Sequence, residues 1–199
     1  MKGPLVATAS LKEFFRVLLG EVAGHQGVQL AAGTEFYLVH LLSEFAATDK
    51  LFTPTEGGRR EQEPLALLYH RAQQAERDER IRMLRRLGDV SLYTAGFFSE
   101  ALRERPVGPD YYIQMGGTAY GQVAVLSAAS AFAAVYGELH EKFRLVVDLL
   151  EEISARGLVA HGAEGALRVY ESWVRTGSGR LERVLVDAGV MPGKPGLVN

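Results

Sequence analysis

The feature that most constrains the fold is a long uncharged segment near the middle of the chain. From Tyr111 to Gly137 no side chain is charged at neutral pH, although 23% of the whole chain is Asp, Glu, Lys or Arg. A segment of this length could cross a bilayer, which takes roughly 20 predominantly apolar residues. Polar residues such as Gln122 and Ser127 interrupt it, however, and alanine and glycine supply much of the remainder. We therefore expect a helix at about 110–136 that is surrounded by other helices rather than by lipid.

The other apolar residues recur at helical spacing. One set is separated alternately by four and three residues, which is the spacing of a helix-packing seam: Leu139, Phe143, Val146, Leu150 and Ile153. No run alternates apolar and polar residues between hairpin turns, as a sheet would require. The sequence therefore predicts an all-α protein, a bundle of seven or eight helices around the uncharged helix.

The chain length suits a single domain. The 199 residues fall in the usual range for one domain, and 47% of them are hydrophobic, enough for a core. Ser10 can cap a first helix, so we predict a flexible tail at 1–9, one helical domain at 10–189 and an extended tail at 190–199, where prolines prevent helix formation.

Two internal boundaries follow from glycine, proline and polar residues. The residues from Leu65 to Leu87 contain neither glycine nor proline, so they predict one helix that Gly88 ends, with Asp89 capping the next. The polar segment from Thr48 to Glu63 predicts a long loop, the best internal candidate for a partner-contacting element.

Charge and cysteine content exclude several functional classes. The net charge of −2 gives no overall positive field, so we expect no nucleic-acid partner. The absence of cysteine excludes disulfides, thiolate metal sites and a cysteine nucleophile, and it fits a reducing compartment. Charged residues interrupt the first apolar stretch, so no secretory signal is predicted and we expect a cytoplasmic protein.

The common catalytic and cofactor motifs are missing. No histidine follows a glutamate by three residues as in a di-iron bundle, and the sequence contains neither Gly-x-Ser-x-Gly nor a phosphate-binding loop. Glu21 with His25, and His40 with Glu44, are four residues apart, a spacing that favours exposed ion pairs over a metal site. We therefore expect no metal and no cofactor, and the missing motifs favour a non-catalytic protein over an enzyme.

A group of aromatic and small residues leaves open a ligand-binding alternative. Glycines inside a helix cost about 1 kcal/mol each relative to alanine, so those in the uncharged segment need close packing, a break or a ligand as compensation. In the alternative, the bundle is a binding protein or an enzyme that takes a small apolar molecule into a pocket lined by Tyr93, Phe97, Tyr111, Tyr112, Met115, Gly116, Gly117 and Tyr120.

The leading functional hypothesis is a non-catalytic intracellular adaptor or regulatory protein. It would act through a helical surface, by contact with a protein partner or with a second copy of the chain. A locally basic run offers a weak candidate for partner binding, although solvation of a helix face also explains it: Arg77, Arg80, Arg82 and Arg86.

Overall fold

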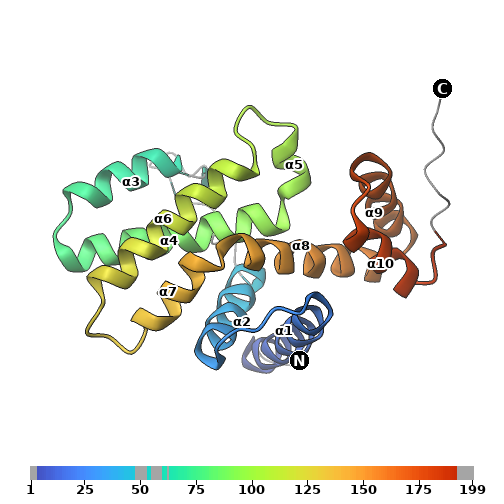
Figure 1. The fold of residues 1–199 in the computed structure, drawn as a ribbon, viewed down its shortest axis with the longest axis horizontal. Helices are drawn as coiled ribbons and strands as arrows, with labels where there is room; N and C mark the ends of the chain where they lie inside the picture. The colour runs from blue at the N-terminus through green and yellow to red at the C-terminus, as the bar shows by residue number, and fades with distance from the viewer. Residues whose placement is uncertain (1–3, 48–52, 55–59, 62, 192–199) are drawn as a thin grey trace.

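The computed structural model describes residues 4–47, 53–54, 60–61 and 63–191. Within these ranges the regular secondary structure is helical apart from one pair of very short strands, and turns connect the helices (Figure 1). The helices are α1 Pro4–Gln26, α2 Ala32–Ala47, α3 Leu65–Gln74, α4 Arg77–Phe97, α5 Ser99–Arg103, α6 Pro109–Leu126, α7 Ala133–Glu141, α8 Phe143–Ala160, α9 Ala163–Thr176 and α10 Gly179–Asp187. The strands β1 Thr53–Pro54 and β2 Arg60–Glu61 pair antiparallel. The all-α prediction is confirmed, with more and shorter helices than expected.

Helix α4 lies at the centre of the main bundle. It packs against α3, α6 and α8, while α1 packs against α2 and α8. Figure 1 shows α8, in orange, running from this bundle to α9 and α10 at one end of the molecule. Helix α8 therefore packs against the main bundle and also against α9 and α10. The candidate site lies where these two groups of helices meet.

The apolar interior is divided into two clusters. The larger one contains buried residues of α1 to α4 and α6 to α8, and it ends along α8 at Ile153. The smaller one consists of five buried residues: Ala155, Val169, Trp173, Val184 and Leu185. The predicted seam from Leu139 to Ile153 is confirmed, since every residue of that set is buried in the larger cluster.

The boundary predicted at Gly88 is wrong. The extended backbone of Ala75 and Glu76 separates α3 from α4, and α4 then continues through Gly88 to Phe97. A Cβ atom at Gly88 would lie 2.5 Å from Cε1 of Tyr120. The missing side chain therefore admits the Tyr120 ring, and Gly88 serves close packing rather than helix termination.

The uncharged segment is not one helix. Helix α6 ends at Leu126, and an irregular turn leads to α7, which begins at Ala133. The α6 part is sheltered, with Tyr120 fully buried, whereas Val125 is 76% exposed and Ala128 also faces solvent. The first helix also begins earlier than the Ser10 cap implied, at Pro4. None of the helices in the described ranges has the length and apolar character that crossing a membrane requires.

Candidate functional site

A cleft of about 430 Å³ opens where the two apolar clusters meet. Its walls are the end of α4 with α5 on one side, the second half of α8 at the base, and α9 with the start of α10 on the other side. Apolar side chains from each wall line it, among them Phe98, Leu158 and Leu181. The volume falls within the range of small-molecule sites, and such sites favour junctions between packed units.

An ion-pair network spans the mouth of the cleft. Arg175 on α9 contacts Glu100 on α5, and its second guanidinium nitrogen lies 3.2 Å from Glu104. All three side chains are at least partly exposed, so each pair alone contributes at most about 1 kcal/mol. These contacts join α9 to the main bundle across the cleft.

A second arginine lies deeper, between α10 and α8. The Arg180 guanidinium is 2.9 Å from Asp148 and 3.2 Å from Glu151. Burial raises the pKa of the Glu151 carboxyl, an effect that the charge of Arg180 and a hydrogen bond from Ser99 oppose. Glu151 is thus a half-buried carboxylate that lines the cleft and is incompletely compensated within the protein.

One buried hydroxyl in the cleft has no hydrogen-bond partner in the described part of the chain. Ser172 on α9 is 7% exposed, lines the cleft, and its Oγ is unpaired. Leaving a buried polar atom unpaired costs about 1–3 kcal/mol. Among the residues that line the cleft, Ser172 is thus the one with an unsatisfied buried hydroxyl in the described part of the chain, and its Oγ is covered by neighbouring atoms.

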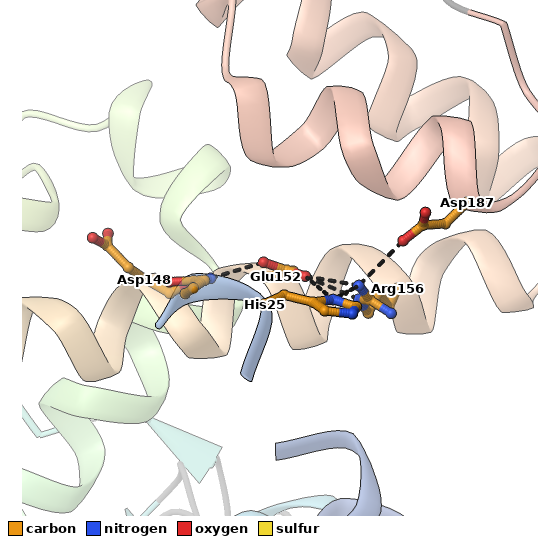
Figure 2. Close-up of polar contacts among 6 residues, drawn as sticks. His25, Asp148, Glu152, Arg156 and Asp187 are labelled. Atoms are coloured by element: carbon orange, nitrogen blue, oxygen red, sulfur yellow. Dashed lines mark hydrogen bonds and ion pairs between the residues drawn. The ribbon is translucent and has the colours of Figure 1, made fainter. Parts of the chain in front are cut away.

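At the base of the cleft, a buried carboxylate connects three helices (Figure 2). The Glu152 side chain is 1% exposed, accepts a 2.8 Å hydrogen bond from Nε2 of Gln26 on α1, and pairs with Arg156 at 2.9 Å. Arg156 also reaches Asp187 on α10 and donates to Nδ1 of His25 at 2.8 Å. The network fixes α8 against α1 and α10 and so holds the base of the cleft in place.

The two histidine–glutamate spacings give different outcomes. His40 Nε2 lies 3.5 Å from Glu44, the exposed ion pair that the sequence predicts. His25 instead lies near Glu152 and Arg156, contacts that its spacing from Glu21 did not indicate. Within the described residues, no group of three or more His, Asp or Glu side chains could hold a metal ion.

The predicted Tyr/Met/Gly pocket is divided between separate environments. On α6, the position that a Cβ of Gly116 would occupy is filled by the Phe143 ring, 2.3 Å away, and Gly117 faces the same ring. Tyr93 and Phe97 instead stack on each other with Phe45 alongside Tyr93. Of the eight candidates, only Phe97 lines the cleft.

The remaining candidates of that set lie at other places on α6. Tyr111 and Tyr112 form an edge-to-face pair near its start, and both are partly buried, as is Met115. Tyr120 is fully buried and donates a 2.7 Å hydrogen bond to Asp89. Packing therefore accounts for the small residues of α6.

The basic run lies in the first half of α4, whereas the cleft lies at the C-terminal end of this helix. Arg77 donates to the Leu126 carbonyl at the end of α6, and Arg80 donates to Gln73 and Gln122. Arg82 and Arg86 are exposed. The first two arginines thus tie α4 to α3 and α6 instead of forming a free basic face.

One hydrogen-bonded aspartate in the main bundle was not predicted from the sequence. Asp89 Oδ1 accepts hydrogen bonds from the hydroxyls of Tyr37, at 2.5 Å, and of Tyr120. Burial raises the pKa of Asp89 to about 6, although the hydrogen bonds from both tyrosines and the charge of Arg85 lower it. Because Tyr120 belongs to the core of the main bundle and Tyr37 packs against it, we assign Asp89 to that core rather than to the cleft.

The residues that form the cleft come from three distant stretches of sequence, and no motif marks them. Nor do known proteins supply one: no protein-family model, no curated protein and no solved structure matches this chain.

Proposed function

We propose that this protein is a non-catalytic helical binding protein whose ligand is a small molecule held between α5, α8, α9 and α10. The observation that carries the proposal is a cleft of small-molecule size at the junction of two apolar clusters, lined by apolar side chains together with charged ones. The cytoplasmic location expected from the sequence belongs to the same proposal and depends on the lack of cysteine.

The position of the cleft suits a regulatory role. Its two walls belong to different apolar clusters that share α8, and exposed ion pairs join them across the mouth. A ligand that contacts both walls would stabilise one relative arrangement of α9 with respect to α5. Binding can therefore be transmitted to the outer surfaces of α9 and α10.

A blocking substitution tests this proposal. Ala101 is exposed on α5 and lines the cleft, so Ala101→Trp should fill it without disturbing the core. Ala134 is exposed on α7 outside the cleft, and Ala134→Trp is the matched control. In protein-observed NMR with a small-fragment library, binders should shift amide signals of residues 96–104 and 168–176 in the wild type and in Ala134→Trp, but not in Ala101→Trp. Shifts that survive in Ala101→Trp, or an absence of binders, would refute the proposal.

We propose self-association through α1 as a second role, in keeping with the adaptor hypothesis. Phe14 and Val17 are 52% and 46% exposed beside a shallow hollow that Glu21 also lines. An antiparallel pair of α1 helices would bring the exposed Phe14 and Val17 of two copies together and remove them from water.

Light scattering across a concentration series tests the second role. The wild-type protein should form a dimer as its concentration rises, and Phe14→Glu should remain monomeric. Phe36→Glu, which changes a 71% exposed ring on α2, is the control and should dimerise like the wild type. A monomeric wild type at every concentration would exclude this role.

Most of the Thr48–Glu63 loop, also proposed for partner contacts, lies outside the described residues.

A further inference from the structure

The arginines that line the cleft are already neutralised by carboxylates. Each of them forms an ion pair within the protein: Arg103, Arg168, Arg175 and Arg180. An anionic ligand would have to displace a carboxylate and leave it without its cation. Among the described residues, the cleft therefore holds no unpaired arginine that would attract an anion.

The glutamates of the lining are occupied in the same way. Four of the five form ion pairs with arginines: Glu100, Glu104, Glu151 and Glu152. The fifth, Glu171, is exposed, and an ion pair at an exposed carboxylate contributes little affinity. The charges of the lining therefore select neither a cation nor an anion.

One wall of the cleft is aromatic, and other rings hold it in position. Phe97 and Phe98 both line the cleft, and Phe98 is 44% exposed. The Tyr93 ring stacks on Phe97 with 4.6 Å between centroids and meets Phe98 edge-on at 6.0 Å. Phe45 in turn stacks on Tyr93 at 4.7 Å. These contacts orient Phe97 and Phe98 before any ligand binds.

The backbone of this wall is also fixed to α8. Ser154 donates a 3.4 Å hydrogen bond to the carbonyl oxygen of Phe97. Gly96 packs so closely on Leu150 that a Cβ atom at position 96 would collide with that side chain. A ligand therefore meets a preorganised aromatic surface and does not have to order it, which favours binding.

The base and the opposite wall are aliphatic. Leu158 on α8 is 39% exposed and lines the cleft, together with Val169 on α9 and Leu181 on α10. A molecule that covers Phe98 and Leu158 removes apolar surface of both from water. If that molecule carries an aromatic ring, an offset or edge-to-face contact with Phe98 adds to the affinity.

We propose that the ligand of this cleft is an uncharged aromatic molecule that packs against Phe98 and Leu158. This inference extends the proposed binding function and depends on it. It assigns the chemical class of the ligand and the two residues that bind its apolar body.

Three probes with the same bicyclic body and different head groups test the uncharged class. They are 2-naphthalenemethanol, 2-naphthylmethylamine and 2-naphthoate, titrated into the full-length protein at pH 7.0 while the amide signals of residues 96–104 and 168–176 are followed by NMR. The alcohol should bind at least about tenfold more tightly than the ammonium or the carboxylate probe, because a charge that enters the cleft loses water without gaining an unpaired counter-charge. A charged probe that binds as tightly as the alcohol would overturn the assignment.

A saturated analogue and two substitutions test the aromatic contact. Decahydro-2-naphthalenemethanol should bind about threefold less tightly than 2-naphthalenemethanol, since it cannot make the ring contact with Phe98. Phe98→Leu keeps an apolar side chain and should abolish this preference, whereas Leu158→Ala should weaken both probes alike. Phe36→Leu, at a 71% exposed ring on α2 outside the lining, is the control and should change neither affinity. A preference that persists in Phe98→Leu would refute the role of that ring, and unchanged affinities in Leu158→Ala would refute the role of that leucine.

The outcomes separate this inference from the proposed function. If a charged probe binds most tightly, or the saturated analogue binds as tightly as the aromatic one, the binding role stands and the uncharged aromatic class is wrong. If none of the probes binds, that class is also wrong, and the fragment screen with Ala101→Trp decides the binding role independently.

Discussion

At the scale of single residues, Asp89 has the most consequential environment in the main bundle. Two tyrosine hydroxyls donate to the same carboxylate oxygen, and the Tyr120 ring next to it is completely buried. The hydrogen bonds and Arg85 favour the ionised form, but burial outweighs them and raises the pKa of Asp89 from 3.8 to about 6. The folded protein therefore binds a proton at Asp89 more tightly than the unfolded chain does.

This shift predicts how stability depends on pH. Because the folded pKa lies above the unfolded one, the contribution of Asp89 is most favourable below about pH 4 and is lost as pH rises through about 6. The loss is at most about 3 kcal/mol. Asp89→Asn cannot ionise, so its free energy of unfolding relative to wild type should improve by about 1–3 kcal/mol between pH 4 and pH 8.

Urea denaturation at several pH values between 4 and 8 measures the difference. The control is Asp110→Asn, whose carboxylate is exposed and pairs with Arg144 on the surface. Its stability relative to wild type should change little over the same range. Parallel profiles for wild type and Asp89→Asn would show that Asp89 does not titrate abnormally.

The role of Asp89 was not predictable from its neighbours in sequence. An aspartate after a glycine is a good helix-capping signal, and the sequence alone favoured that interpretation. The actual partners, Tyr37 and Tyr120, come from α2 and α6. Only tertiary packing brings their hydroxyls to one oxygen, so no local pattern could indicate it.

At the scale of helices, the glycines of α6 and α4 permit close contact between neighbours. A Cβ at Gly116 would lie 2.3 Å from Cζ of Phe143 and 2.7 Å from Cβ of Ser91. Gly116→Ala should therefore destabilise the protein by about 1–3 kcal/mol, in spite of the better helix propensity of alanine. Thermal and urea denaturation measure this effect.

Gly20 provides the matched control for this prediction. It lies within α1, is exposed, and has open space where a Cβ would stand. Gly20→Ala should stabilise the protein by about 0.5–1 kcal/mol through helix propensity alone. If both substitutions stabilised the protein, or both destabilised it, the packing role of Gly116 would be contradicted.

The class of each element was predictable, but several helix ends were not. The apolar spacing identified the buried seam of α7 and α8 because that spacing and the burial have the same physical cause. The break at Ala75 and Glu76 carries no glycine or proline, and the turn after Leu126 falls within an uncharged segment. At both places tertiary packing of the following helix overrides the local propensity.

At the scale of the whole molecule, the candidate site is a product of topology. Glu151 lies on α8, Ser172 on α9 and Phe98 in the link between α4 and α5, and each residue type is common at such positions. From sequence alone, a glutamate or a serine on a helix is expected to face solvent. The sequence therefore gave no signal for the cleft, which exists because α8 extends beyond the main bundle and carries α9 and α10 with it.

The division of the core also predicts the order of unfolding. The smaller cluster has only five buried apolar residues, and its links to α5 are exposed ion pairs. A cluster with so little buried apolar surface should open before the main bundle does. The only tryptophan of the chain, Trp173, is 4% exposed in this cluster, so its fluorescence reports on that unit alone.

In urea, the Trp173 fluorescence transition should therefore precede the far-UV circular dichroism transition, which follows all ten described helices. Arg175→Ala should move the fluorescence midpoint to still lower urea and leave the main circular dichroism transition in place, because it removes the contacts to Glu100 and Glu104. Salt at about 1 M should act on the wild type in the same direction and have little further effect on Arg175→Ala, since it screens the same exposed charges. Coincident transitions in both proteins would mean that α8 couples the two clusters into one cooperative unit, and the cleft would then lie within a single rigid body.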